Sequence, residues 1–114
     1  MVDINTFKFE DFWENEIGET SIYFITPKDL IENTDKTLDI EHTEVMIDLQ
    51  VDETEIAISV YVAFTVYDRE NEIYNDVDWR PYKELTHEQI IKLCKIAGYD
   101  LQGKIDDGVA VVYY

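Results

Sequence analysis

Carboxylates are the most abundant side chains in this sequence that could do chemistry. The 114 residues include 26 aspartates and glutamates, against nine lysines and arginines and two histidines. Two carboxylates in a cleft can act as general acid and general base. At this abundance, however, neighbouring carboxylates arise by chance, and aromatic residues flank none of them in the pattern of a sugar-binding cleft. The sequence therefore predicts no catalytic pair, and we expect the protein not to be an enzyme.

Two stretches could supply metal ligands, but neither has the spacing of a known motif. Residues 68–72 (DRENE) resemble the start of a calcium-binding loop, but the sixth position is not glycine and Trp79 occupies the twelfth position, where the loop needs glutamate. His42 lies near Glu41 and Glu44, yet the two histidines are 45 positions apart, which matches no zinc motif. We therefore predict a solvated turn at 68–72 and no metal or other cofactor.

The single cysteine, Cys94, excludes an internal disulfide. It falls on the apolar stripe of a predicted helix, away from the helix N-terminus that would activate a thiol, so we interpret it as a buried structural residue. The sequence has no phosphate-binding loop, dinucleotide fingerprint or nucleophile elbow. It also has no secretory pattern and no apolar stretch of membrane-spanning length. We expect a cytoplasmic protein that does not bind a membrane.

The net charge of −17 is the strongest functional signal in the sequence. Nucleic acid and anionic membranes repel such a chain, so direct binding to either is disfavoured and a basic protein partner is favoured. The charge could instead serve solubility alone, or adaptation to high salt. However, −17 exceeds what solubility needs, and self-repulsion at that charge costs stability. We therefore predict that the acidic surface binds a partner.

The predicted partner-binding residues are carboxylates on expected outer surfaces, together with two aromatic residues in an acidic segment. Alternate residues of a strand lie roughly 6.6 to 7 Å apart, so carboxylates at that spacing can imitate a row of phosphates. The aromatic residues could be interface anchors, or could instead cover the edge of a small core. The set comprises Glu10, Asp11, Glu14, Glu44, Asp48, Asp52, Glu53, Glu55, Asp76, Asp78, Trp79 and Tyr82.

These features favour a small acidic inhibitor that occludes a basic nucleic-acid-binding protein, such as a nuclease. In size, charge and lack of catalytic motifs the chain is similar to phage-encoded anti-defence proteins, including DNA mimics that block restriction or CRISPR nucleases (anti-restriction and anti-CRISPR proteins). An immunity protein or antitoxin that neutralises a nuclease toxin would use the same surface. A small ligand- or metal-binding domain and a homodimeric structural protein are further alternatives.

The elements that must position these side chains centre on residues 43–67. Apolar and polar residues alternate strictly from Val45 to Val51 and from Ile56 to Val66, which predicts a half-buried β-hairpin. A four-residue loop at 52–55 pairs Val51 with Ile56. The apolar phase reverses near residues 41–43, which predicts a bulge or a break in the strand. The polar face would present Glu44, Asp48 and Asp52 as an acidic row, unless a helix covers it.

The remaining segments predict a single α+β domain over residues 1–114, with a mainly antiparallel sheet of about four to five strands. We predict helices near 7–17 and 87–97 packed on the sheet, the second capped by Thr86 and Gln89. For 7–17 a short strand is the competing interpretation, because Phe7 and Phe9 also alternate. A short helix is expected at 27–33. Strands are expected at 21–26, 73–80 and 109–114, with 73–80 at the sheet edge.

Overall fold

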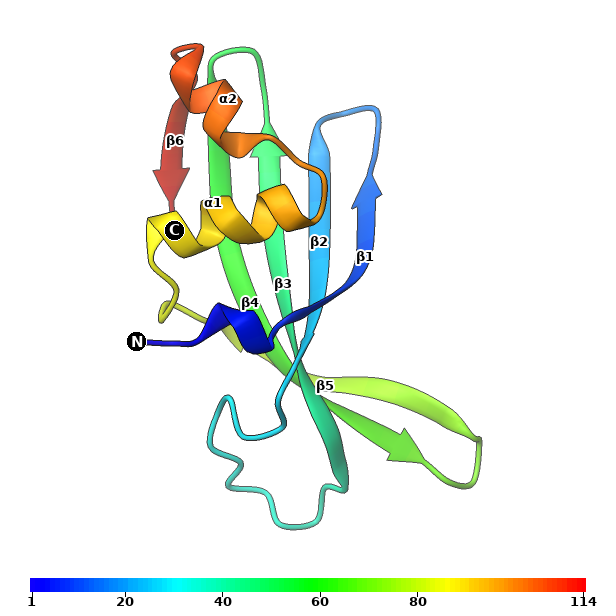
Figure 1. The fold of residues 1–114 in the computed structure, drawn as a ribbon. Helices are drawn as coiled ribbons and strands as arrows, with labels where there is room; N and C mark the ends of the chain where they lie inside the picture. The colour runs from blue at the N-terminus through cyan, green and yellow to red at the C-terminus, as the bar shows by residue number, and fades with distance from the viewer.

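The long hairpin of β3 (Ile40–Val51) and β4 (Glu55–Asp68) is the centre of a six-stranded sheet in the computed structural model, which describes all 114 residues. The first five strands lie antiparallel in chain order, and β6 pairs parallel with the start of β4. Figure 1 shows the two helices on one face of the upper sheet, while β5 extends away from the lower end. The remaining elements are η1 (Ile4–Thr6), β1 (Lys8–Glu14), β2 (Glu19–Thr26), β5 (Ile73–Pro81), α1 (His87–Ile96), α2 (Leu101–Asp106) and β6 (Ala110–Tyr113).

The predicted register of the hairpin is confirmed. Val51 pairs with Ile56, and Ile47 pairs with Val60. The carboxylate of Asp52 closes the loop, because it accepts hydrogen bonds from the backbone N–H groups of Thr54 and Glu55, each at 2.8 Å. The predicted bulge is also present, between Ile40 and His42. The alternation of the sequence therefore sets which side chains of β3 and β4 face the core.

The core lies between the sheet and α1. Its sheet side consists of aliphatic residues of β3 and β4 that are almost fully buried: Val45, Ile47, Leu49, Ile56, Ile58 and Val62. From α1 come Leu93 and Cys94, both 0% exposed. The predicted capping box fixes the start of α1, since the Thr86 hydroxyl accepts from the Gln89 backbone and the Gln89 side chain accepts from the Thr86 backbone.

The predicted helix at 7–17 is wrong, because this segment forms the edge strand β1. The physical reason is a bulge between Phe9 and Asp11. An extra residue in a strand places positions three apart on the same face. Phe9 and Phe12 consequently pair with Phe24 and Ile22, which belong to the core. A bulged strand thus imitates the apolar spacing of a helix, and the competing strand interpretation is correct.

Two other predictions need correction, and one helix was not predicted. Residues 27–33 form turns rather than a helix. The sheet has six strands, more than the predicted four to five, although the α+β class with a mainly antiparallel sheet holds. The helix α2 was not predicted, because Gly103 lies inside it; the carboxylate of Asp100 caps it by accepting from the Gly103 N–H at 2.9 Å.

We predict that Val60→Asp prevents folding. Val60 is 7% exposed and faces the core opposite Ile47, so the variant would bury a carboxylate without a partner. Far-UV circular dichroism and urea titration would measure the loss of structure. The control is Ala57→Asp, on the same strand but on the opposite, partly exposed face. A folded Val60→Asp protein would mean that the two faces are assigned incorrectly.

Gly18 gives a second stability prediction. Its φ is +90°, and a Cβ atom there would collide with the backbone oxygen of Val51, whose N–H donates to the Gly18 carbonyl at 2.8 Å. Gly18→Ala should therefore lower the free energy of unfolding by roughly 3 kcal/mol, from strain and overlap together. Gly98→Ala is the control, because Gly98 has φ +88° but open space around it; it should cost only about 1 kcal/mol. Equal losses in urea titrations would contradict the contact with Val51.

Candidate functional site

The structure separates most of the predicted site residues into two groups, near opposite ends of β3. Asp52 follows Glu44 by eight positions along the chain, a span of about 26 Å for an extended strand. The first group lies at the turn of the hairpin and comprises Glu14, Asp52, Glu53 and Glu55. The second group surrounds the lower half of β3 and comprises Glu10, Asp11, Glu44, Asp76 and Trp79, with Asp48 between the two groups. The predicted residues therefore do not form one continuous surface.

The first group belongs to an end of the molecule where three connections meet (Figure 1). The Val51 N–H donates to Gly18 in the β1–β2 turn at 2.8 Å, and the Ala110 N–H donates to Thr54 in the hairpin loop at 3.1 Å. Seven exposed carboxylates lie here, and none forms an ion pair. We call this surface the acidic end; its carboxylates are Glu14, Glu16, Asp52, Glu53, Glu55, Asp106 and Asp107.

An exposed apolar side chain lies within the acidic end. Ile17 is in the β1–β2 turn and is 77% exposed. The helix predicted at 7–17 included Ile17 and was expected to pack on the sheet, so the exposure of Ile17 was not predicted. Lys104, the basic residue of α2, lies 5.7 Å from the ring centroid of Tyr99. Ile17 is therefore an exposed apolar side chain at one flank of the acidic end, and burying it would be favourable.

The second group lines a hollow on the sheet face opposite the helices, which we call the outer groove. Its volume is about 530 Å³. The aromatic ring of Trp79 extends over this face and meets the ring of Tyr23 edge-on, with the centroids 6.5 Å apart. Outward positions of β2, β3 and β4 carry no lysine or arginine. The lining residues are Glu10, Asp11, Trp13, Ser21, Tyr23, Glu44 and Asp76.

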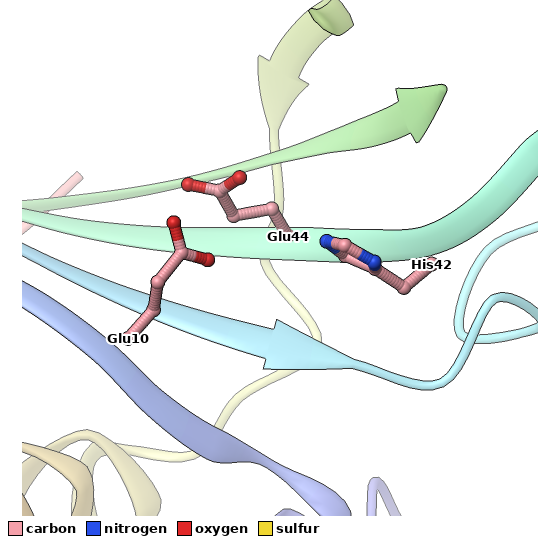
Figure 2. A group of neighbouring side chains, drawn as sticks. All are labelled: Glu10, His42 and Glu44. Carbon is pink, nitrogen blue, oxygen red and sulfur yellow. The ribbon is translucent and has the colours of Figure 1, made fainter. Parts of the chain in front are cut away.

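Glu44 is the buried centre of the outer groove. It is only 5% exposed. Burial, together with the neighbouring carboxylates of Asp76 and Glu10, raises the pKa of Glu44 to about 8. Burial also raises the pKa of Glu10, and the Asp76 carboxylate adds to that increase. Figure 2 shows the carboxylates of Glu10 and Glu44 and the imidazole of His42 converging from β1 and β3.

The expected acidic row of Glu44, Asp48 and Asp52 is not uniform. Glu44 is buried, whereas Asp52 is exposed and its pKa is lowered by the backbone N–H groups of Thr54 and Glu55. Asp48 is partly buried, and burial raises its pKa. Only part of this row is therefore an open, ionised surface, because Glu44 is buried and Asp48 is partly buried.

The remaining predicted residues lie in different settings. Trp79 is 38% exposed, but Tyr82 is 7% exposed and belongs to the core cluster, so Tyr82 covers the core. Asp78 has a φ of +62° and lies 3.9 Å from the Arg80 guanidinium. Burial raises the pKa of Cys94 to about 12, which agrees with a structural thiol. No helix is long and apolar enough to span a membrane.

Sequence reasoning missed the approach of Glu10 to His42 and Glu44. The approach depends on the β1–β2–β3 strand order and on the bulge at Glu10.

Comparison with known protein families, curated proteins and solved structures finds no match. The fold and surface thus define a sheet-dominated α+β protein with an acidic end and an acidic outer groove, and its function must be inferred from its own residues.

The raised pKa of Glu44 predicts a specific pH dependence for the metal-free protein. Glu44 is protonated in the folded state up to about pH 8 but ionises near its ordinary pKa when unfolded. Its contribution to stability is therefore complete at pH 4 and is lost as the pH rises to 8, by at most about 1.4 kcal/mol per pH unit. Glu44→Gln should remove this loss.

Urea titrations from pH 5 to 8 in the presence of EDTA would measure this effect. The control is Glu41→Gln, an exposed residue of the same strand. The stability of Glu44→Gln, relative to the wild type, should increase with pH, while that of Glu41→Gln should stay constant. Parallel pH profiles for all three proteins would show that Glu44 ionises normally in the folded state.

Proposed function

We propose that this protein binds a basic nucleic-acid-binding protein, such as a nuclease, through its acidic end and inhibits it by occluding the nucleic-acid-binding surface. The observation that carries the proposal is the meeting of three connections that present seven exposed, unpaired carboxylates, with Ile17 exposed at one flank. A basic cleft offers the complementary potential. The apolar side chain of Ile17 would be buried on binding and would slow dissociation.

The charge of the chain is not neutralised internally, which supports a role in recognition. Only two ion pairs form, Arg69 with Asp39 at 3.6 Å and Arg80 with Asp78 at 3.9 Å, and both involve exposed side chains. A surface that keeps one sign of charge focuses its potential and accelerates association with an oppositely charged partner. Such acceleration suits an inhibitor that must reach its target before nucleic acid does.

Two kinds of inhibitor would use the same surface. A phage anti-defence protein that imitates DNA would compete directly with DNA for the basic cleft. An immunity protein or antitoxin would bind beside the cleft or over it, and DNA need not displace it. Self-association into a homodimer is a different expectation. Edge-to-edge strand pairing between two copies could not involve β3 or β4, because both strands are already paired on both sides.

Charge reversal at the acidic end tests the proposal. The test variant is Glu53→Lys/Glu55→Lys/Asp107→Lys. The control variant is Asp29→Lys/Glu32→Lys/Glu84→Lys, which changes the net charge equally at exposed residues elsewhere. We expect the test variant to bind the partner at least about tenfold more weakly, with a flatter salt dependence, because direct charge pairs are lost. The control should stay close to the wild type.

The measurement begins with capture on the immobilised wild type, elution by a salt gradient and repetition with excess DNA. Affinities of the purified partner for the three proteins are then compared. Displacement by DNA supports occlusion of a nucleic-acid-binding cleft, whereas capture that DNA leaves intact favours the immunity or antitoxin alternative. The proposal fails if no basic partner is captured, or if test and control variants weaken binding equally.

A further inference from the structure

We infer that the outer groove binds a divalent transition-metal ion, of the class of Zn²⁺ or Mn²⁺, through Glu10, His42 and Glu44. This inference is independent of the proposed function, because none of the three residues belongs to the acidic end. The side chains come from β1 and β3, and Figure 2 shows that all three point toward one another. The site would therefore tie the edge strand to the central hairpin.

The distances suit a metal ion. One potential ligand atom from each of Glu10, His42 and Glu44 lies within 4.8 Å of the others. With bonds of about 2.1 Å, the ligand atoms of a tetrahedral ion lie about 3.4 Å apart. Side-chain movements of up to about 1 Å would therefore bring the three atoms to bonding distance.

Glu44 provides an observation beyond the clustering of these side chains. It is 5% exposed, and the hydroxyl of Thr65 lies 3.5 Å from its Oε2. The neighbouring Asp76 carboxyl can share a hydrogen bond with Glu44 only when one of the two is protonated. The same hydroxyl lies 2.9 Å from Asp76 Oδ1, and a hydroxyl has only one proton to donate. Glu44 is thus a buried carboxylate without a donor of its own, which is costly unless a cation or proton neutralises it.

Two β-bulges aim the ligands at this point. The β1 ladder shifts register between Phe9 and Asp11, on either side of Glu10. The β3 ladder shifts between Ile40 and His42. Bulges redirect side chains and are common beside functional sites. Two independent interruptions of regular pairing therefore converge on the same three side chains.

The ligand types select the class of metal. Imidazole nitrogen favours Zn²⁺ and other transition metals, whereas carboxylate oxygen also accepts Mn²⁺. Mg²⁺ and Ca²⁺ prefer oxygen ligands throughout, so His42 disfavours both. Asp76 lies beside the site and accepts a hydrogen bond from the Thr65 hydroxyl, which places a further carboxylate where it can complete or orient the ligand set.

The experiment uses the full-length chain without a histidine tag, stripped with EDTA. Thermal unfolding and calorimetric titration would be measured with Zn²⁺, Mn²⁺ and Mg²⁺ separately. We expect Zn²⁺ or Mn²⁺ to raise the melting temperature in a concentration-dependent manner, because the ion binds the folded state, and Mg²⁺ to have a much smaller effect. Co²⁺ should give visible absorption bands from coordination by His42.

Matched variants test the assignment. Glu44→Gln and His42→Gln should each reduce affinity for the ion at least about tenfold, and His42→Gln should also alter the Co²⁺ bands. Glu41→Gln removes an exposed carboxylate from the same strand and should bind as the wild type does. The inference is overturned if neither Zn²⁺ nor Mn²⁺ stabilises the wild type, if Glu41→Gln loses as much affinity as Glu44→Gln, or if His42→Gln binds normally.

Discussion

The pairing of β3 with β4 in one register is the constraint on which the rest of the structure depends. Burying one aliphatic side chain contributes roughly 1.5–3 kcal/mol, and Ile47, Leu49 and Ile58 are among those almost completely buried here. A shift by one residue would expose the whole set. The alternation of side chains that places Ile47 in the core also places Glu44 on the opposite face. The packing of the core therefore determines on which face the acidic groups of β3 lie.

Glu44 shows the conflict that this constraint creates. Its strand is paired on both sides, and Glu10 on β1 and Asp76 on β5 come close to it. A buried carboxylate beside two other carboxylates is locally unfavourable, although the surrounding strands follow the pattern of the sequence. Locally unfavourable arrangements of this kind are expected at functional sites, where the residues serve function at a cost in stability. The register of the hairpin therefore creates the outer groove as well as the core.

Local patterns predicted the hairpin, its register, the bulge before it and the capping box of α1, because each depends on residues close in sequence. The first strand was not predictable in the same way, since its bulge places Phe9 and Phe12 at helical spacing. Both surfaces depend on contacts between distant segments. The acidic end needs three connections to meet, and the outer groove needs β1 to pair with β2, which in turn pairs with β3.

The two surfaces would respond differently to ionic strength. Carboxylates of the acidic end are exposed, so their interactions with a partner are screened over about 8 Å at physiological salt. Glu44 is buried, and interactions among buried charges are screened much less. An interaction that disappears in salt but tolerates a chelator would therefore come from the acidic end. One that tolerates salt but disappears with a chelator would come from the outer groove, so ionic strength and chelation together assign any binding activity to one surface.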